Sequence, residues 1–382
     1  MNTTGETAGT PIPMVMAIEV SAAKWLLGFS DGTRERLRTI AAWDQKAFAT
    51  EVQLARQKMG HDEATPVMCC YEAGRDGFSI HRFVTSKGIG NTVIDPSSVE
   101  VDQRQKRRKT DRTDVRKLLR LQERRHYHVL PAYREVTVPG EADEAAMRPH
   151  RERKRLVKER TAHCSRIRSL LALHGVRCGK VSALDPEQVC DWAGRPLPTA
   201  ARQEMTRQLE RLRTVERQLA AVEAAQQRHL AAQASPADEQ AARLCKLRGV
   251  GMHSALVLSK EFFGWRHFAG RKQVGALAGL TGCPYASGAS AHDQGISKAG
   301  SRRVRATMIE LAWLWLRWQP ESDLSQWFLR RTACGTARAR RRCIVALARK
   351  LLVALWKYIE HGIVPDHAVW SDAEHGETAK AA

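Results

Sequence analysis

Two aspartates stand three residues apart in "KTDRTDVRKLLR", residues 109–120, within a strongly basic stretch of the chain. Residues three apart are neighbours on a helix surface, so Asp111 and Asp114 would share one helical face. Each could simply be an acid that the helix dipole favours near an N-terminus. As a pair, however, they repel one another unless a cation neutralises them, and Mg²⁺ takes such oxygen ligands. The spacing therefore predicts one side of a metal site.

Two further acids stand in or directly after apolar segments that read as strands. Glu19 lies in "MVMAIEV", and Glu72 closes "PVMCCYE" before a glycine turn. A carboxylate there is costly unless it is paired or metal-bound, and ligand sites of open α/β sheets gather at strand ends. Glu19 alone could lie on a solvated strand face. Together the four acids predict a site for Mg²⁺ (or Mn²⁺), in which two ions would clamp the attacking and leaving oxygens of a phosphoryl transfer.

The charge of the chain indicates the kind of partner. Its 382 residues contain 62 Lys and Arg against 41 Asp and Glu, a formal net charge of +21. The run from Arg104 to Arg125 alone holds 11 basic and 3 acidic residues. Such an excess favours binding to phosphates, and nucleic acid is the commonest polyanion. We expect Arg107, Arg108 and Lys109 to contact it.

Other classes of protein are disfavoured. The N-terminus lacks a basic segment followed by an apolar one, and no apolar run reaches the roughly 18 residues of a membrane span. The nine cysteines form no C-x-x-C pairs, so neither a zinc site nor a secreted disulfide framework is indicated. We expect a cytosolic, reduced protein.

The hydrophobic period changes along the chain and predicts three regions. From Met14 to Pro96, strand-like segments alternate with one helical segment, which implies an α/β sheet domain. From about residue 100 to 245 nearly everything reads as helix, and Met205, Leu212 and Leu219 form a heptad seam typical of a coiled coil. "SPADE", residues 235–239, restarts a helix with serine as N-cap and proline at the first position. A glycine-rich, basic and mainly helical region follows.

The C-terminal region carries two candidate phosphate-binding segments. "LRGVGMHSALVL" reads as helix, turn and helix, in which Gly249 and Gly251 allow tight turning and N–H groups at the next helix start could hold a phosphate. An ordinary helical hairpin is the alternative. "SKAGSRRVR" offers further cations, which are either phosphate contacts or a solvated basic face. These are Lys298, Arg302, Arg303 and Arg305.

These motifs carry a family resemblance. "AIEVSAAKW", "YEAGRDGF" and "KTDRTDVRKLL" resemble the acidic motifs of the IS110 (IS-one-ten) family of insertion-sequence transposases, relatives of the pilin-gene inverting recombinases. Residues 246–305 resemble the family's transposase domain over its whole length. The resemblance implies an α/β RNase H-like (RuvC-like) catalytic domain at 14–130, a helical coiled-coil region at 131–245 and a mainly α transposase domain at 246–365. Residues 1–13 and 366–382 would be flexible tails.

The resemblance also implies a mechanism. Family members carry Asp-Glu-Asp-Asp and an essential serine, so Ser287 of "GLTGCPYASG" would attack a DNA phosphodiester while the four acids hold Mg²⁺. Ser290 and Ser297 are nearby competitors. The first acid is aspartate in the family and Glu19 here, which keeps the charge but adds a methylene.

The family further implies its partners. It uses a structured non-coding RNA to choose donor and target DNA, and we expect the basic helices to bind it. A dimer or tetramer would place the coiled coil between subunits. The protein would be bacterial, cytoplasmic and associated with the nucleoid.

Two other classes of function stay open. A metal-dependent junction-resolving nuclease would need only the four acids and would survive loss of Ser287. A decayed transposase, with Glu19 in place of aspartate, would bind nucleic acid without Mg²⁺-dependent strand breakage.

Overall fold

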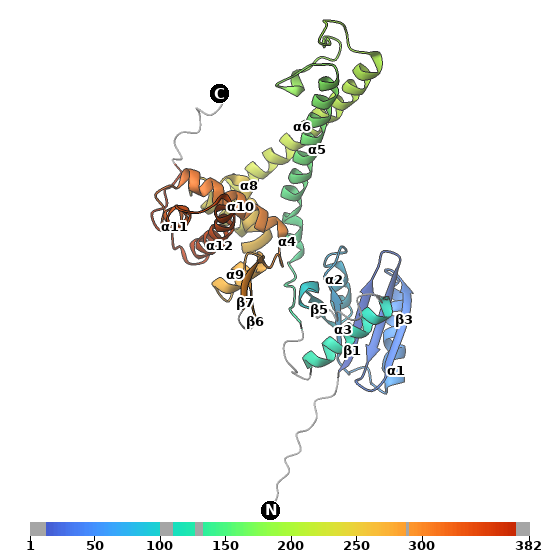
Figure 1. The fold of residues 1–382 in the computed structure, drawn as a ribbon. Coiled ribbons are helices and arrows are strands. Elements are labelled where there is room, and N and C mark those ends of the chain that lie inside the picture. Colours follow the sequence, from blue (N-terminus) through green and yellow to red (C-terminus); the bar gives the residue numbers. More distant parts are fainter. Residues whose placement is uncertain (1–12, 100–109, 127–132, 288–289, 372–382) are drawn as a thin grey trace, which may run out of the picture. The chain divides into compact units, whose positions relative to one another are not determined.

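The structure is a computed structural model that describes residues 13–99, 110–126, 133–287 and 290–371, with the backbone alone at 285–287 and 290–293. The chain forms two compact units, Met1–Val138 and Pro139–Ala382 (Figure 1). Arg107, Arg108 and Lys109 lie outside the described ranges, so their predicted role stays a prediction.

The first unit is built on a five-stranded mixed sheet. Its strands are β1 (Met14–Val20), β2 (Lys24–Ser30), β3 (Glu35–Ala41), β4 (Val67–Glu72) and β5 (Gly90–Ile94). The strand order is β3-β2-β1-β4-β5. β1, β2 and β3 are antiparallel, whereas β4 runs parallel to both β1 and β5. The predicted α/β sheet domain is confirmed.

Helices cover both faces of this sheet. α1 (Gln45–Met59) and α2 (Ser79–Ser86) pack on one face, where Phe48 and Phe83 join the buried side chains of β1 and β2. α3 (Asp111–His126) packs on the other through Val115, Leu118 and Leu119. Two-sided coverage explains why β1 and β2 read as continuous apolar runs. The short 3₁₀ turn Pro96–Ser98 follows β5.

The second unit begins with a long helical hairpin. α4 (Glu141–Ala146) leads into α5 (Arg148–Leu173), and α6 (Thr199–Ala232) returns alongside α5 (Figure 1). The 3₁₀ turn Val181–Ala183 lies between them. Met205 and Leu212 of the predicted seam are buried against Ile167 and Leu171 of α5. The seam is helical as predicted, and its buried residues pack against α5 of the same chain. The expectation that the coiled coil lies between subunits stays a prediction.

The rest of the second unit is mostly helical, as predicted. Ser235 caps α7 and accepts a hydrogen bond from the Asp238 backbone N–H, with proline at the first turn, as the sequence indicated. A single two-stranded hairpin interrupts the helices that the structure describes here. The elements are α7 (Pro236–Cys245), α8 (Met252–Leu258), a π-helical turn η4 (Ser259–Phe263), α9 (Arg271–Leu277), β6 (Gly282–Ser287), β7 (Ser290–Ile296), α10 (Arg302–Trp318), α11 (Asp323–Thr332) and α12 (Ala337–His361).

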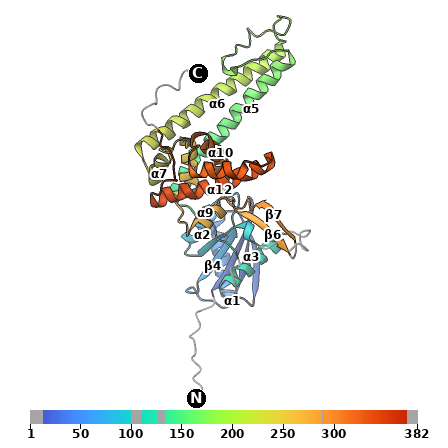
Figure 2. The same ribbon diagram turned by 60° about the vertical axis from the view of Figure 1, so that its left-hand side comes forward.

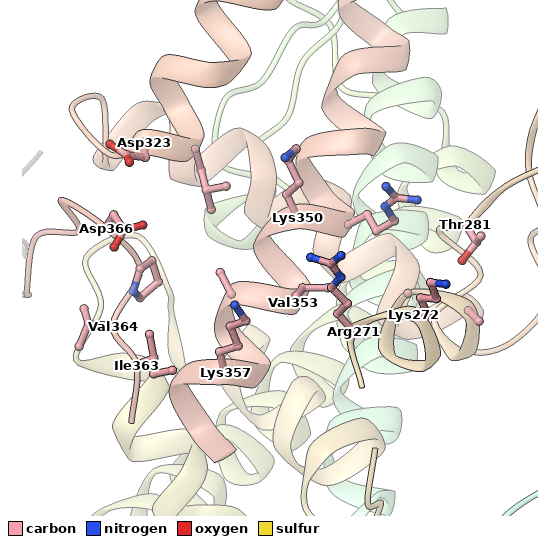
Figure 3. Close-up of a pocket in the computed structure, with 16 residues that line it drawn as sticks. Arg271, Lys272, Thr281, Asp323, Lys350, Val353, Lys357, Ile363, Val364 and Asp366 are labelled. Carbon is pink, nitrogen blue, oxygen red and sulfur yellow. The ribbon is translucent and has the colours of Figure 1, made fainter. Parts of the chain in front are cut away.

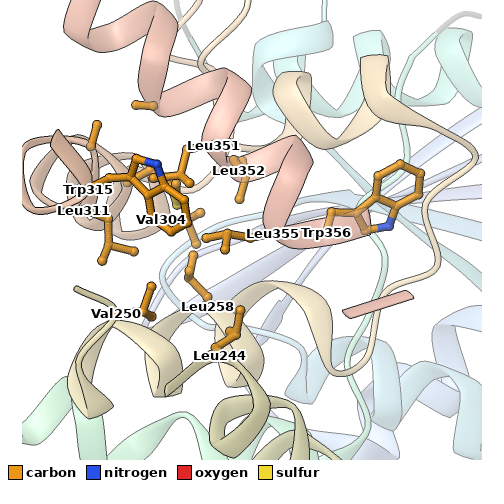
Figure 4. Close-up of a cluster of buried hydrophobic side chains, with 14 of the residues drawn as sticks. Leu244, Val250, Leu258, Val304, Leu311, Trp315, Leu351, Leu352, Leu355 and Trp356 are labelled. Atoms are coloured by element: carbon orange, nitrogen blue, oxygen red, sulfur yellow. The ribbon is translucent and has the colours of Figure 1, made fainter. Parts of the chain in front are cut away.

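The core of this helical part surrounds α12. Figure 4 shows Leu351 and Leu355 of α12 meeting Trp315 of α10 and Leu258 of α8. Residues 366–371, assigned by sequence to the flexible C-terminal tail, are held in place. Gln319 donates to the carbonyl of Val369 at 2.7 Å, and Leu247 forms a β-bridge with Trp370.

Candidate active site

Glu19 and Glu72 lie side by side at the carboxyl ends of two adjacent parallel strands. The register of β1 and β4 pairs Ile18 with Tyr71, and each glutamate follows its paired residue by one position. Neighbouring strands are about 4.8 Å apart, so the two backbones bring both carboxylates to the same edge. As the sequence predicted, Glu19 lies within its strand, one residue before the end of β1, and Glu72 closes β4.

Both glutamates belong to the sheet face that α3 covers. Glu19 pairs across β1 and β2 with Leu26, and Glu72 pairs across β4 and β5 with Ile94. Leu26 and Ile94 are members of the buried cluster under α3, and paired residues point to the same face. Cys70 lies two residues before Glu72 in β4 and therefore on the same face. Burial raises the pKa of the Cys70 thiol, and the nearby charge of Glu72 raises it further, which is consistent with this placement.

α3 brings the two aspartates to this edge. Asp111 and Asp114 lie in its first turn, where a helix dipole favours acids. Thr113 stabilises the helix start, because its hydroxyl donates to the Thr110 carbonyl at 2.7 Å. The far end of α3 is tied to the opposite end of β2, where Ser30 donates to Glu123. All four acids therefore belong to the same end of the same face.

One glycine allows α3 to approach the sheet closely. Gly28 in β2 lies under Val115, and a Cβ atom at Gly28 would be only 2.3 Å from Val115 Cγ1. Real Cβ contacts of this length essentially do not occur, so a side chain here would push α3 outward. Gly28 therefore sets the height of the aspartates above the glutamates, a role that sequence reasoning missed.

Glu19 and Asp111 line one small pocket of about 230 Å³. Lys24 also lines it, and its Nζ is 3.8 Å from Asp111 Oδ2 in a largely exposed ion pair. Oxygen ligands facing a small, solvent-reachable hollow suit a hard divalent cation. No group of three or more His, Cys, Asp or Glu side chains in metal-binding proximity occurs among the described residues. A shared ion on all four acids thus stays a prediction.

Ser287 ends β6 in the hairpin between α9 and α10. Its backbone pairs with Ser290 of β7, which places both serines beside the hairpin tip. Ser297, the third candidate, lies at the base, where its N–H donates to the Thr281 carbonyl at 2.8 Å. The side chains of Ser287 and Ser290 lie outside the described part, so the choice of nucleophile stays a prediction.

The hairpin base is fixed by two glycines and an arginine. Gly300 has φ +96° and its Cβ would be 2.1 Å from the Leu277 carbonyl oxygen, so only glycine fits. Gly279 has φ +67° and is equally crowded. Arg305 Nη1 donates to the carbonyls of Ala278 at 3.2 Å and Lys298 at 3.1 Å. These contacts give the strand that carries Ser287 a rigid foundation.

The other predicted phosphate contacts have mixed surroundings. Gly249 takes φ +88° and its Cβ position is 2.9 Å from Trp318, which explains this glycine without a ligand. Gly251 precedes α8 and faces open space, and Arg302 is exposed at the start of α10. Lys298 has a left-handed backbone, φ +56°. Contacts with nucleic acid stay predictions for all of them.

Arg303 instead joins a buried ionic cluster that the sequence prediction overlooked. Its guanidinium pairs with Glu261, a buried acid of the π-helical turn η4. Arg151 binds both carboxylate oxygens of Glu261 at 2.7 Å, and His150 Nε2 lies 2.8 Å from Oε1. Burial opposes ionisation, but these partners outweigh it and lower the pKa of Glu261 to about 2. The sequence signal for this cluster was Glu261 itself, an acid within the mostly apolar segment "LVLSKEFFGW".

The cluster also contains a third arginine, which is tied to the same turn. Arg266 donates to the Glu261 backbone carbonyl at 2.6 Å, and burial lowers its pKa to about 10. The cluster thus links the start of α5 with the start of α10 through η4. It fixes the helical hairpin to the element that follows the serine hairpin.

A basic, mostly helical unit and a mixed sheet with acids gathered at one edge define a candidate enzyme acting on nucleic acid. Comparisons with known proteins give the family. Residues 241–326 match the model of the "Transposase IS116/IS110/IS902 family". The chain is 41% identical over 383 residues to the "Putative transposase y4rJ" of Sinorhizobium fredii, covering 93% of each protein. The chain belongs to this transposase family.

More distant relatives carry similar names. The chain is 31% identical over 186 residues to the "Probable family 20 transposase" of Pseudomonas aeruginosa, covering 47% of this chain and 53% of the relative. It is 25% identical over 187 residues to the "Transposase for insertion sequence element IS1328" of Yersinia enterocolitica, covering 49% and 54%. None of the helices that the structure describes is both long and apolar enough to cross a membrane.

Proposed function

We propose that this transposase cuts and rejoins DNA at a composite site, in which the acids of an RNase H-like N-terminal unit act together with Ser287. The observation that carries the proposal is the arrangement of the elements that bear the four acids: two adjacent parallel strands and the helix that covers the same sheet face. Glu19 and Glu72 come from adjacent parallel strands, and Asp111 and Asp114 from the helix covering them. The helix dipole favours Asp111 and Asp114 at the start of α3, but it does not account for glutamates at the ends of the adjacent strands β1 and β4.

The chemistry of the four acids suits a divalent cation, since carboxylate oxygens are the ligands that Mg²⁺ takes. Glu19 and Asp111 share a small pocket, and Glu72 and Asp114 lie at the same end of that face. These four would hold Mg²⁺, which when bound neutralises charge on the phosphate and on the oxygens that attack and leave. Lys24, paired with Asp111, compensates part of the negative charge of the pocket and is positioned to give way to a cation or a phosphate.

Ser287 supplies the covalent step. Its Oγ loses a proton and forms a bond to the phosphorus of a DNA phosphodiester, while one bridging P–O bond breaks and the departing sugar oxygen takes a proton. The resulting phosphoserine conserves the bond energy, so attack by a sugar hydroxyl of a second strand rejoins DNA and releases the serine. Gly288 follows in sequence and has no side chain to hinder an approaching strand.

The charge of the chain supports two nucleic-acid partners. A net charge of +21 suits binding to phosphates, and a structured guide RNA would use part of this basic surface beside the DNA. In a dimer or tetramer the hairpin of α5 and α6 would lie between subunits, through residues outside the seam that packs on α5.

The decisive experiment traps the covalent intermediate. Purified protein, its co-purifying RNA and donor DNA would be incubated with Mg²⁺, and DNA-linked protein would be detected after denaturation. We expect an adduct with wild type and with Ser290→Ala and Ser297→Ala, and none with Ser287→Ala. Cleavage that persists in Ser287→Ala would instead identify a metal-dependent nuclease.

The acids are tested in the same assay. Glu19→Gln, Asp111→Asn and Asp114→Asn should abolish adduct formation and leave the circular dichroism spectrum unchanged, because an amide cannot neutralise the cation. Glu19→Asp distinguishes a working glutamate from a decayed site. If the backbone at Glu19 is set back to suit the longer glutamate, the activity of Glu19→Asp should fall or stay level. If the site has decayed, the activity of Glu19→Asp should rise.

A further inference from the structure

A second hollow in the C-terminal unit has the lining of a ligand site. It has a volume of about 840 Å³, within the usual range of 300–1,000 Å³ for ligand pockets. α9, α12 and the segment after α12 form it, and Figure 3 shows their side chains facing one space. We call it the α9–α12 pocket. Nothing in the proposed cleavage chemistry uses it.

The two helices present the same residue pattern to the pocket. α9 contributes Arg271, Lys272, Gly275 and Ala276, and α12 contributes Arg349, Lys350, Val353 and Ala354. Both follow Arg-Lys-x-x-small-Ala, in which the cations and the small residues lie one turn apart on one helical face. Each helix thus places a pair of cations beside a small apolar surface.

A close helix approach keeps the two cation pairs together. A Cβ at Gly275 would lie 3.4 Å from Cδ of Arg349 and 3.5 Å from Thr281 Oγ1, which are ordinary contact distances, so the stem of Arg349 lies directly beside α9. Arg271 and Arg349 both line the pocket. Two positive charges held near one another without an anion between them repel, so this arrangement suits a bound phosphate.

The charges of the pocket are unevenly placed. Figure 3 shows Arg271 and Lys272 at one side and the acids Asp323 and Asp366 at the other. Among the described residues, the five lining cations form no ion pair with a carboxylate, whereas Asp323 Oδ1 is 2.8 Å from His367 Nδ1. The cations are solvent-exposed, which leaves them able to meet an anion. They are Arg271, Lys272, Arg349, Lys350 and Lys357.

The floor between the charged sides is aliphatic. Val353, Ala354, Leu324 and Val364 line it, each only partly buried. Phosphate needs the cations but gains nothing from this floor, whereas the flat face of a nucleobase would cover it. A duplex keeps its bases stacked inside and offers phosphates alone. The combination of cationic rim and apolar floor therefore selects an unpaired nucleotide.

We infer that the α9–α12 pocket binds one unpaired nucleotide of a nucleic-acid strand, with its base on Val353 and Ala354 and its phosphates on the cations of both helices. The pocket also touches the element that carries Ser287. Thr281 lines it and directly precedes β6, whose six residues span about 20 Å at about 3.3 Å each. A strand held here would be anchored at the foot of the serine hairpin.

The test measures binding without cleavage. Full-length protein in EDTA would be titrated with labelled single strands, dT12 and rU12, and with a 12-base-pair duplex, at several salt concentrations. The charge variant is Arg271→Gln with Arg349→Gln. Ala354→Trp fills the floor while it keeps every charge. Arg338→Gln with Arg341→Gln, exposed positions of α12 outside the pocket, is the matched control.

We expect the charge variant to weaken single-strand binding at least tenfold and to lower the salt slope by about 0.7 per charge removed. Ala354→Trp should weaken single-strand binding about tenfold and leave duplex binding unchanged. Preference of wild type for dT12 or rU12 identifies DNA or RNA as the source of the strand. Equal losses for duplex and single strand, or wild-type single-strand binding by Ala354→Trp, would overturn the nucleotide pocket.

Circular dichroism of each variant excludes misfolding as the cause of a loss. The binding measurements are made in EDTA without cleavage, so they do not depend on the attack by Ser287. Failure of this inference is therefore distinguishable from failure of the cleavage proposal, which concerns adduct formation only.

Discussion

Gly28→Ala is the substitution that most directly tests whether the close approach of α3 to the sheet positions Asp111 and Asp114 relative to Glu19 and Glu72. The added Cβ would lie 2.3 Å from Val115 Cγ1, so these atoms must separate by about 1.1 Å to reach the 3.4 Å of ordinary contact. Leu119 and Leu37, at 3.0 and 3.2 Å, prevent an easy sideways escape. Gly28 has a paired strand backbone that alanine can adopt, so the effect is steric alone.

The displacement should affect chemistry more than folding. Overpacking of this kind costs about 1–3 kcal/mol of unfolding free energy. A misplacement of about 1 Å can reduce a catalysed rate by roughly 100-fold, because Asp111 and Asp114 move with α3. We therefore expect Gly28→Ala to unfold at lower urea concentration and to lose Mg²⁺-dependent adduct formation by about two orders of magnitude, with DNA binding retained.

A second substitution makes the test specific. Val115→Ala removes the methyl group that the new Cβ would meet, so it should restore adduct formation in the Gly28→Ala background. Alone it should cost about 2 kcal/mol as a buried cavity. Urea unfolding of the four proteins yields the coupling energy, expected at roughly 1–2 kcal/mol in the direction of rescue. Wild-type activity in Gly28→Ala, or no rescue in the double variant, would refute the reasoning.

Three further predictions concern the second unit. The pKa of Glu261 is lowered to about 2 from an ordinary 4.5, so its ionised form contributes about 3 kcal/mol to the unfolding free energy. This contribution should be present above pH 4.5 and lost as the pH falls toward 2. Urea unfolding of Glu261→Gln should lack this pH dependence. Gly249→Ala, at φ +88° against Trp318, should lower the unfolding free energy by about 1–3 kcal/mol, whereas Gly251→Ala, in open space, should change thermal stability little. Leu212→Ala should lower the unfolding free energy by about 2–5 kcal/mol. The molecular mass measured by light scattering should not change. A lower mass would mean that an oligomer has dissociated and that the seam is shared between subunits.

Much of the first unit could be predicted from the sequence because its strands are short, apolar and separated by clear turns. The predicted strand-like segments "MVMAIEV", "KWLLGFSDG" and "ERLRTIAA" correspond to β1, β2 and β3 within a residue or two. α2 was missed, since eight residues with aromatic and β-branched side chains give little helical period to recognise. β6 and β7 were also missed, because glycine, serine and alanine carry no strand-like alternation.

Strand register could not be predicted, and it is what brings the glutamates together. The residue types placed Glu19 and Glu72 at strand ends, but only the pairing of Ile18 with Tyr71 makes them neighbours on one face. A slip of one residue would have turned one of them to the opposite face. The shared face of Asp111 and Asp114 was easier to predict, because residues three apart on one helix are neighbours whatever packs against the helix.

Close contacts between distant segments explain the remaining misses. A glycine in a turn can be recognised in the sequence by its polar neighbours. Gly28 instead lies inside the apolar run "KWLLGFS" and resembles a weak strand position. Its function is visible only where α3, some ninety residues later, packs against it. Arg303 shows the converse case, since its basic surroundings suggested a phosphate contact although Glu261 already holds it. A basic run thus reports charge reliably but not which of its members remain available, and the exposed cations of the α9–α12 pocket are a better guide to where a strand can bind.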